Sequence, residues 1–238
     1  MPVAILCGGL ATRMHPLTLF KPKSMIEVTG VPFIKLQLDQ LERQGVEEVV
    51  LCLGHMGDQI YDYVTRLKTN LIINFSDDDP EHPGTAGAIR NALPLLGKQF
   101  FIMYGDSYLL CDFARVQFSF FARKSKAMLT VYYNGNQFEQ SNVELISSVG
   151  EWILRYDKTK PTKKMKHVDY GLGVMCSWVL EEYCQELSDL ADVYGMLSRN
   201  NVLLGHEIHQ RYRYYEIGSM KGLADFEWYL EEKRNDNT

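Results

Sequence analysis

The sequence predicts a mixed α/β fold in which a mainly parallel central sheet carries helices on both faces. Two observations support this prediction. Up to Tyr104, short apolar segments alternate with segments of helical periodicity, which is typical of parallel strands joined by right-handed crossovers. Beyond Tyr104, strand-like segments follow one another closely, so antiparallel strands are expected to join the sheet. The chain has no Pro/Gly/Ser-rich linker and no internal repeat, which favours a single domain over residues 1–238.

The N-terminal half contains four expected strands and three expected helices. The strands are short apolar runs, and the first ends at Gly8-Gly9, where the chain turns. The first helix has Ile34, Leu38 and Leu41 on one face and ends at Gly45. The expected strands are Val3–Leu6, Glu48–Leu53, Leu71–Phe75 and Phe100–Tyr104, and the helices start after Val31-Pro32 and span Gln59–Leu67 and Thr85–Leu93.

The C-terminal half is richer in strands. Four segments have the alternating or continuous apolar pattern of strands, and two longer segments have a helical pattern. The expected strands are Leu129–Tyr133, Val143–Ile146, Trp152–Tyr156 and Leu172–Cys176, and the expected helices are Ser177–Leu187 and Gly218–Glu232.

The composition argues against several classes of protein. A chain of 238 residues with 46% hydrophobic residues can bury a full core. Its net charge of -5 does not suit general binding to nucleic acid, and no apolar run approaches the roughly 20 residues that span a membrane. The N-terminus lacks the pattern of a signal peptide. We therefore expect a cytoplasmic protein without nucleic-acid or membrane partners.

The cysteines are expected to be reduced and mostly buried thiols. Their number is odd, their spacing is irregular, and they form no C-x-x-C pair, so the pattern fits neither a disulfide framework nor a zinc site. The five positions are Cys7, Cys52, Cys111, Cys176 and Cys184.

A basic, stiff loop follows the first strand and is the first candidate for chemistry. Gly8 and Gly9 allow backbone N–H groups to approach a polyphosphate closely, and Arg13, Lys21 and Lys23 add positive charge. The loop matches neither the dinucleotide-binding fingerprint nor the Walker loop. It suits a triphosphate, and the alternative is a solvated basic turn.

Two carboxylates are candidates for binding a divalent cation. Asp106 follows the apolar segment Phe100–Tyr104, so it is expected at the carboxyl edge of the sheet, where α/β proteins bind their ligands. Glu216 ends an alternating segment near the C-terminus. The alternatives are that Asp106 caps a turn and that Glu216 forms a surface ion pair.

Taken together, these motifs resemble those of the sugar-1-phosphate nucleotidyltransferases. The segment Gly8–Thr18 (GGLATRMHPLT), with Pro22-Lys23, resembles the long opening motif of that family. Three shorter segments resemble its later motifs in the same order: Gly84–Ala88, Gly105-Asp106 and Glu216–Ser219. The resemblance covers nearly the whole chain and is greatest to short bacterial enzymes similar to heptose-1-phosphate and mannose-1-phosphate guanylyltransferases.

The resemblance implies a fold and a reaction. The fold is the nucleotide-diphospho-sugar transferase fold, which is Rossmann-like and of the GT-A type. The reaction converts an NTP and a sugar 1-phosphate to an NDP-sugar and pyrophosphate, for the synthesis of precursors of cell-surface polysaccharides or glycoconjugates. Residues up to about 110 would bind the nucleotide, and residues from about 111 to 238 would bind the sugar phosphate. The cofactor would be Mg²⁺ or Mn²⁺, and the enzyme a monomer or a homodimer.

The resemblance also assigns roles to individual residues. Arg13, Lys23 and Asp106 would be catalytic, with the two cations holding phosphate groups. The nucleotide site would comprise Leu6, Gly8, Gly9, Asp79, Gly84 and Thr85, the sugar-phosphate site Asn142, Asp157, Lys158 and Asp169, and the metal site Asp106 and Glu216. The alternative for Asp169 is a structural role, in which it ties down the neighbouring loop through Lys158 or Arg155.

Four residues depart from the usual pattern of the family. Ala11 replaces a glycine and Ser24 a proline, and neither change is expected to alter more than the pose of the loop. Asp157 replaces a glutamate. Glu216 replaces an aspartate, and its longer side chain weakens its assignment as the second metal ligand.

The base of the nucleotide is expected to be guanine. The Gly8-Gly9 pair resembles guanylyl-, thymidylyl- and cytidylyltransferases more than uridylyltransferases, and the Asp79 carboxylate would accept hydrogen bonds from N1–H and the 2-amino group of guanine. CTP, UTP and dTTP remain alternatives, because the segment Asp77–Glu81 is also a plausible solvated acidic turn.

Two other functions are alternatives to this reaction. A glycosyltransferase of the same general fold would need a D-x-D-like motif, and Asp106-Ser107-Tyr108 lacks its second aspartate. A catalytically silent nucleotide-sugar sensor or regulatory subunit would not need Arg13 and Lys23. No general base is required for the transferase reaction, because the attacking phosphate oxygen is already an anion.

Overall fold

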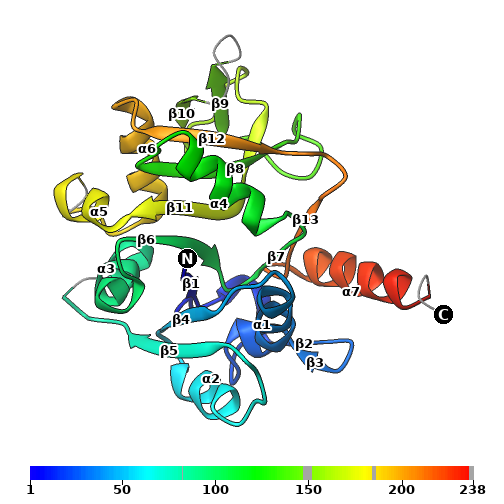
Figure 1. Cartoon of the computed structure of the whole chain (residues 1–238). Helices are drawn as coiled ribbons and strands as arrows, with labels where there is room; N and C mark the ends of the chain where they lie inside the picture. Colours follow the sequence, from blue (N-terminus) through cyan, green and yellow to red (C-terminus); the bar gives the residue numbers. More distant parts are fainter. Residues whose placement is uncertain (82, 147–151, 184–185, 236–238) are drawn as a thin grey trace.

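The computed structural model describes residues 1–81, 83–146, 152–183 and 186–235. A nine-stranded mixed sheet runs through the middle of the molecule in the order β5-β4-β1-β6-β11-β8-β12-β10-β9 (Figure 1). Four parallel strands form its N-terminal half: β1 (Val3–Leu6), β4 (Glu48–Leu53), β5 (Ile72–Asp77) and β6 (Gln99–Tyr104).

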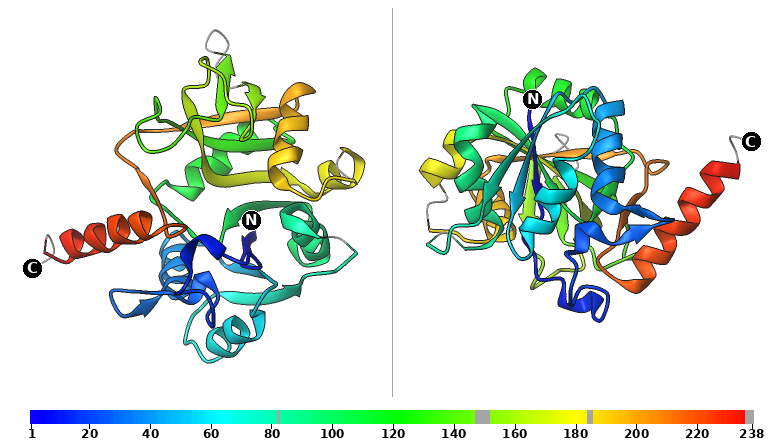
Figure 2. Two further views of the ribbon diagram at one scale, coloured as in Figure 1. Left: turned by 180° about the vertical axis from the view of Figure 1, so that it is seen from behind. Right: turned by 90° about the horizontal axis from the view of Figure 1, so that it is seen from below.

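The order of these four strands determines where the helices lie. The chain moves outward from β1 to β4 and β5 through α1 (Phe33–Arg43) and α2 (Gly57–Val64), and then returns through α3 (Gly84–Leu96) to β6 on the other side of β1. Because each crossover is right-handed, reversing the direction places α3 on the opposite face from α1. The views from the front and from behind show this arrangement (Figures 1 and 2).

Antiparallel pairings predominate in the C-terminal half. The long strand β11 (His167–Cys176) lies antiparallel between β6 and β8 (Ala127–Tyr133). Beyond them, β12 (Leu203–Ile208) runs parallel to β8, and the hairpin of β9 (Val143–Ile146) and β10 (Trp152–Tyr156) forms the edge. The helices of this half are α4 (Phe113–Ala122), α5 (Ser177–Tyr183) and α6 (Leu190–Arg199).

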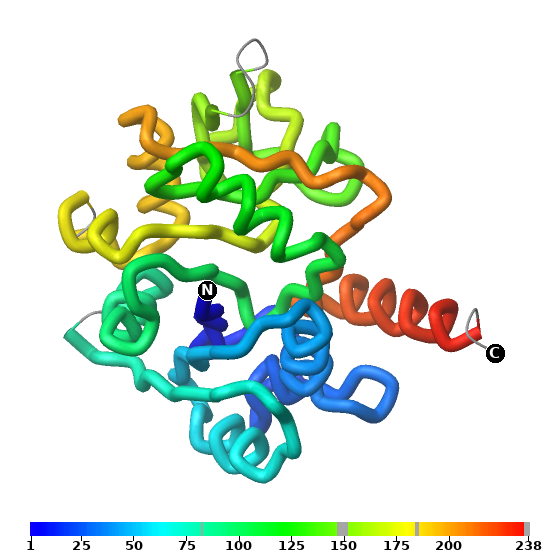
Figure 3. Tube along the Cα trace, viewed as in Figure 1, coloured from blue at the N-terminus to red at the C-terminus, as the bar shows by residue number. Residues whose placement is uncertain are grey.

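Two short ladders and the last helix complete the structure. The residues of β2 (Glu27–Val28) pair with β3 (Val31–Pro32), and those of β7 (Ser107–Leu109) pair with β13 (Tyr214–Glu216). Two 3₁₀ turns, Thr12–Met14 and Lys23–Met25, shape the first loop. Helix α7 (Met220–Asn235) extends away from the sheet, as the Cα trace shows (Figure 3).

A second apolar cluster fixes the first loop against α7. Met14 from the loop, Phe33 from α1 and Phe226 from α7 are fully buried together, separate from the main core around the sheet. The rings of Phe33 and Phe226 pack edge to face at 5.6 Å. The C-terminal helix therefore stabilises the loop in which Arg13 and Lys23 lie.

The mixed α/β fold predicted from the sequence is confirmed. The strands expected at Val3–Leu6, Glu48–Leu53, Val143–Ile146 and Trp152–Tyr156 have those bounds in the structure. The strand expected at Leu172–Cys176 begins earlier, at His167, and α4, α6 and β12 were not predicted. The helix expected over Ser177–Leu187 ends at Tyr183, and residues 184–185 lie outside the described residues.

The described cysteines agree with the expectation of free thiols. Cys7, Cys52, Cys111 and Cys176 are free and buried, and Cys184 lies outside the described residues. None of the helices in the described part of the chain has the length and apolar character required to cross a membrane.

Candidate active site

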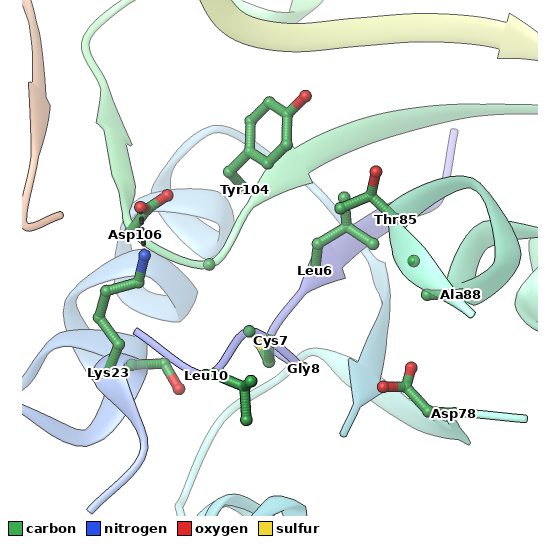
Figure 4. A pocket seen from close by; sticks show the side chains of 14 residues that line it. Leu6, Cys7, Gly8, Leu10, Lys23, Asp78, Thr85, Ala88, Tyr104 and Asp106 are labelled. Carbon is green, nitrogen blue, oxygen red and sulfur yellow. Dashed lines mark hydrogen bonds and ion pairs between the residues drawn. The ribbon is translucent and has the colours of Figure 1, made fainter. Parts of the chain in front are cut away.

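A cavity of about 470 Å³ opens at the carboxyl ends of β1 and β6. These two strands are neighbours in the sheet. From β1 the chain runs outward on one side to β4 and β5, and it then returns through α3 to β6 on the other side of β1. The site therefore lies at the point where the strand order reverses. The residues that line it come from β1, the first loop, the end of β5, the start of α3 and the end of β6: Leu6, Cys7, Gly8, Gly9, Leu10, Lys23, Ser24, Asp78, Gly84, Thr85, Ala88, Tyr104, Gly105 and Asp106 (Figure 4).

Glycines bring the backbone segments of this cavity close together. A Cβ at Gly105 would lie 2.6 Å from the carbonyl oxygen of Leu6, so the ends of β1 and β6 can approach only because that position has no side chain. Gly84, with φ of +83°, lies against the carbonyl of Ser188, where a Cβ would collide with that oxygen. The start of α3 is thereby joined to the start of α6, and the amide of Leu190 also donates to Thr85 Oγ1 at 2.8 Å.

Ala11 adopts the backbone conformation that explains why glycine is usual at this position. Its φ is +50° and its ψ is +37°, which is the left-handed region. The hydroxyl of Thr18 donates to the carbonyl of Ala11 at 2.9 Å and helps to hold the loop in this shape. The alanine therefore preserves the turn that the resemblance implies, at a cost of about 1 kcal/mol in backbone strain.

Lys23 and Asp106 meet at one end of the cavity. The Lys23 ammonium lies 2.5 Å from Asp106 Oδ2, and Figure 4 shows the two side chains pointing toward each other. Both side chains are partly buried, and the amide of Ile217 donates to the Asp106 carbonyl at 2.9 Å. Asp106 is therefore held between the first loop and the segment that follows β13.

Asp78, and not Asp79, faces the cavity. The Asp78 side chain lies at the opposite end of the cavity from Asp106 (Figure 4), where its Oδ2 is 2.8 Å from the position of a Cβ on Gly8. Partial burial and the neighbouring charge of Asp77 raise the pKa of Asp78 above its ordinary value. Asp79 is absent from the described residues that line the cavity, and its Oδ1 accepts a hydrogen bond from the amide of Glu81 at 2.9 Å, as in an Asx turn.

A second cavity, of about 360 Å³, adjoins the first. Tyr104 and Asp106 line both cavities, so they form the boundary between them. The second cavity is strongly polar, and it is lined by Arg13, Tyr104, Asp106, Glu139, Gln140, Asn142, Lys158, Pro161, Asp169, Gly171 and Glu216.

Asp169 is the centre of a buried network beneath the second cavity. Its Oδ2 accepts a hydrogen bond from the Tyr156 hydroxyl at 3.0 Å and lies 3.5 Å from the Lys158 ammonium. Its Oδ1 accepts from the amide of Gly171 at 2.9 Å, and its own amide donates to Asn142 Oδ1 at 3.0 Å. The network brings Asn142, Lys158 and Asp169 together, as expected from the sequence, and it fixes the direction of Lys158.

Asp157 is not brought to either cavity among the described residues. Its Oδ1 accepts from the amides of Thr159 and Lys160, and its Oδ2 accepts from Arg155 at 2.9 Å. The hydrogen bond from Arg155, followed by those from the two amides, lowers the pKa of Asp157 well below its ordinary value. The Asp157 side chain thus stabilises the turn that leads to Lys160. The next residue, Lys158, is the one that lines the second cavity.

Glu216 lies beside Asp106 and is crowded by negative charge. Residues Glu216 and Ser107 pair in the β13–β7 ladder, so the carboxylate emerges next to Asp106. Glu216 is exposed to solvent, but partial loss of hydration, together with the charges of Asp106 and Glu139, raises the pKa of its carboxyl to about 8. Two adjacent carboxylates suit Mg²⁺, which commonly takes one or two protein carboxylates together with phosphate oxygens of a substrate. No group of three or more metal-binding side chains is found in the described part of the chain.

Most of the residues expected from the sequence line one of the two cavities. Leu6, Gly8, Gly9, Gly84, Thr85, Lys23 and Asp106 line the first, and Arg13, Asn142, Lys158, Asp169, Glu216 and Asp106 line the second. Sequence reasoning missed Asp78, Tyr104, Glu139 and Gly218. A Cβ at Gly218 would lie 3.2 Å from Asp106 Oδ2, so this glycine leaves the Asp106 carboxylate accessible.

Comparison with known proteins identifies the family to which the chain belongs. Residues 3–153 match the MobA-like NTP transferase domain family. A D-glycero-alpha-D-manno-heptose 1-phosphate guanylyltransferase of Campylobacter jejuni is 29% identical over 117 residues, which are 49% of this chain and 52% of that protein. The catalytic subunit beta of a mannose-1-phosphate guanylyltransferase of Dictyostelium discoideum is 37% identical over 116 residues, which are 48% of this chain and 32% of that protein. The chain thus spans about half or less of the length of these relatives.

Solved structures resemble the chain over nearly its whole length. HddC from Yersinia pseudotuberculosis superposes with a TM-score of 0.80 at 21% identity, covering 96% of this chain and 99% of that one. The structure of HddC complexed with GMP-PN gives a TM-score of 0.76. These likenesses establish the nucleotidyltransferase fold, and because the family match covers more than half of the chain, the protein belongs to the family of MobA-like NTP transferase domains.

Proposed function

We propose that the protein is a sugar-1-phosphate guanylyltransferase, which converts GTP and a sugar 1-phosphate to a GDP-sugar and pyrophosphate. The observation that carries this proposal is the pair of adjoining cavities that share Tyr104 and Asp106. One cavity has the glycine-rich lining that suits a nucleotide, and the other has the polar lining that suits a sugar phosphate. A reaction between two anionic substrates would take place at their boundary.

The two cavities are built mainly by different parts of the chain. The first cavity is built by residues up to about 110, and we propose that this part binds the nucleotide. Apart from Arg13, Tyr104 and Asp106, the described lining of the second cavity comes from residues beyond 110, and we propose that this part binds the sugar phosphate. Asp169 is nearly fully buried, so its main contribution is to orient Lys158 and the Gly171 backbone toward the acceptor.

The chemistry requires the neutralisation of charge more than it requires proton transfer. A phosphate oxygen of the acceptor attacks the α-phosphorus of the nucleotide, and pyrophosphate leaves. Two unit charges about 4 Å apart repel by roughly 4 kcal/mol at an effective dielectric constant of 20, so several such pairs would prevent reaction. Lys23 at the first cavity and Lys158 and Arg13 at the second would offset this repulsion and align the two phosphates.

Asp106 and Glu216 would hold a divalent cation, Mg²⁺ or Mn²⁺, at the boundary of the cavities. The fit is supported by the chemistry of the donors, because desolvation and then the charges of Asp106 and Glu139 raise the pKa of Glu216, and a bound cation would offset this repulsion. When bound, the cation would neutralise charge on the phosphates. The role of the protein is to hold the two carboxylates side by side, through the β7–β13 ladder and the hydrogen bond from Ile217 to the Asp106 carbonyl.

Asp78 supports the choice of guanine. Its carboxylate faces the end of the first cavity away from Asp106, which is where the base of a nucleotide would lie when its phosphates are near Lys23. Guanine presents two adjacent donors, N1–H and the 2-amino group, to such a carboxylate. Adenine and cytosine present a ring nitrogen lone pair beside a single amino group, and uracil presents one N–H between two carbonyls. The two named relatives are guanylyltransferases, which favours the same base.

The substrates and the cell compartment complete the proposal. We place the reaction in the cytoplasm, where the four described free thiols would remain reduced. The product would be a precursor of a cell-surface polysaccharide or glycoconjugate, and the enzyme would act as a monomer or a homodimer.

Release of pyrophosphate from a panel of NTPs and sugar 1-phosphates tests the function. We expect turnover with GTP and a heptose or hexose 1-phosphate in the presence of Mg²⁺. Transfer of sugar from an NDP-sugar without pyrophosphate release would instead indicate a glycosyltransferase. Binding of nucleotide-sugar with no turnover of any pair would indicate a sensor.

A further inference from the structure

Tyr104 occupies the boundary between the two cavities. It is the last residue of β6, pairs with Leu6 of β1, and lines both cavities. Its backbone is held firmly, because the buried side chain of Gln37 donates to the carbonyl of Tyr104 at 3.0 Å and to that of Ser107 at 2.8 Å. No hydrogen-bond partner of the Tyr104 hydroxyl is present among the residues that the structure describes.

The Lys158 ammonium lies over the Tyr104 ring. The distance from Lys158 Nζ to the centroid of Tyr104 is 5.4 Å, and the distance to the centroid of Tyr156 is 5.9 Å. Both distances fall within the range of cation–π attraction, which is about 6 Å. On its other side the ammonium is 3.5 Å from Asp169 Oδ2. Two aromatic rings and one carboxylate thus surround a single cation.

The charges of this group favour a fixed ammonium. Burial lowers the pKa of Lys158, but Asp169 and then Glu216 outweigh it, so the net pKa is raised. Burial and the nearby Asp169 raise the pKa of Tyr104 far above its ordinary value, so the ring remains neutral. A long lysine side chain that is 42% exposed would otherwise sample many rotamers.

We propose that Tyr104 is a positioning residue whose ring, rather than its hydroxyl, holds the Lys158 ammonium at the boundary of the two cavities. The inference rests on the proposed function, because the ammonium so placed would meet the phosphate of the sugar 1-phosphate. Asp169 fixes the ammonium from one side, and the ring prevents it from turning away into the first cavity. Tyr104 thereby acts on the acceptor through Lys158 and does not need to touch it.

Steady-state kinetics with two substitutions test the role of the ring. Tyr104→Leu should lower kcat/KM for the sugar 1-phosphate by about 3- to 30-fold, which corresponds to the range of cation–π attraction, and should change KM for GTP little. Tyr104→Phe should restore most of this loss. An equal loss in both variants would assign the effect to the hydroxyl and overturn the proposal. As a control for the loss of an aromatic ring, Tyr133→Leu removes an exposed ring that lines neither of these two cavities.

A double-mutant cycle tests whether Tyr104 acts through Lys158. In a Lys158→Met background, Tyr104→Leu should cause no further decrease in kcat/KM for the sugar phosphate, because the cation that the ring holds is already absent. A full additional decrease in that background would mean that the ring acts independently of Lys158, and would overturn the proposal.

A spectroscopic measurement tests the position of Lys158 without any substrate. Lysines of the whole chain are methylated with ¹³C-formaldehyde, and the Lys158 resonance is identified by its absence from Lys158→Arg. Ring currents should displace it from the other lysine resonances, and Tyr104→Leu, but not Tyr104→Phe, should move it toward them. An unchanged resonance in Tyr104→Leu would overturn the proposal. If no substrate pair supports turnover, the proposed function fails while this result still decides the role of the ring.

Discussion

Lys23 and Asp106 are 83 positions apart in the sequence, yet their side chains form an ion pair with Nζ 2.5 Å from Oδ2. The pair joins the first loop to the end of β6, and it occupies the boundary at which the two substrates would meet. Each partner has a proposed task of its own, the lysine with phosphate oxygens and the aspartate with a cation. Substrate binding is therefore expected to separate the pair, and its members can be tested independently.

Lys23→Ala should lower kcat more than it raises KM for the nucleotide. The transition state at phosphorus concentrates negative charge near the ammonium, and loss of one such contact costs on the order of 3–4 kcal/mol, or about 10²–10³-fold in rate. Steady-state rates of pyrophosphate release measure the effect. Lys21→Ala is the matched control, because Lys21 is partly exposed, pairs with Glu27 and is absent from the described lining of the first cavity. A change in KM alone would show that Lys23 only binds the ground state.

Removal of divalent cations should abolish most turnover. Excess EDTA should stop pyrophosphate release, and added Mg²⁺ or Mn²⁺ should restore it. Asp106→Asn should remove most of the activity at any concentration of Mg²⁺, because it replaces a carboxylate by a neutral group of the same shape. Undiminished rates in EDTA, or full activity of Asp106→Asn, would contradict the assignment of Asp106 to the cation.

Asp78→Asn should change the preference for the base from GTP to XTP. An asparagine still accepts from N1–H through its oxygen, but its NH₂ group donates and therefore matches the C2 carbonyl of xanthine. Calorimetric titration of GTP, ITP and XTP measures this without an acceptor. In the unaltered protein, ITP should bind about 10-fold or more weakly than GTP, because it lacks the 2-amino group. Asp77→Asn is the control, since it removes the same charge from a residue outside the described lining. Equal binding of GTP and ITP would exclude this contact.

Glu216 should make the stability of the metal-free protein depend on pH. Its carboxyl has a pKa of about 8 in the folded protein against 4.5 ordinarily, so between these values the folded chain holds a proton that the unfolded chain has released. This contribution to stability is fully present below about pH 4.5 and is lost as pH rises through about 8. Urea unfolding in EDTA at several pH values should show that the free energy of unfolding decreases as pH rises. In Glu216→Gln this decrease should be smaller. The same slope in both proteins would refute the assignment.

Gly84→Ala should destabilise the protein more than Gly45→Ala. Both glycines have positive φ, +83° and +74°, so each substitution incurs about 1–2 kcal/mol of backbone strain. A Cβ at Gly84 also collides with the Ser188 carbonyl, whereas a Cβ at Gly45 meets nothing within 4 Å. The difference between the two urea midpoints measures the collision alone. Equal midpoints would mean that the contact between α3 and the segment before α6 is easily displaced.

The N-terminal half of the fold is readable from local sequence because β1, β4 and β6 are nearly continuous apolar runs. The missed helices also had signals. In α6, Leu190, Val193, Tyr194 and Leu197 share one face, and Asp189 caps the first turn by accepting from the amide of Ala191. By contrast, β12 has a glycine and a histidine in its middle, and its pairing with β8 depends on residues about 75 positions earlier, which local patterns do not report.

The sequence predicted which segments form the site, but it did not always predict which residue of a segment faces the cavity. Asp78 and Asp79 are adjacent carboxylates just after β5, and which of them faces the cavity depends on how the chain leaves the strand. Tyr104 had no signal of its own, because an aromatic residue at the end of an apolar strand usually belongs to the core. Its role became visible only when β11 and the turn at Lys158 were placed beside β6.

The ladder between β6 and β11, which pairs five residues from Met103 and Leu172 to Gln99 and Cys176, has a mechanical consequence. The ladder joins the proposed nucleotide and acceptor regions into one continuous sheet, and the proposed reacting groups lie where β6 ends. Enzymes with two lobes often close by a hinge motion, but here such a motion would break the hydrogen bonds between β6 and β11. The distance between the two sites is therefore set by the pairing of β6 with β11 and not by the relative position of two movable lobes.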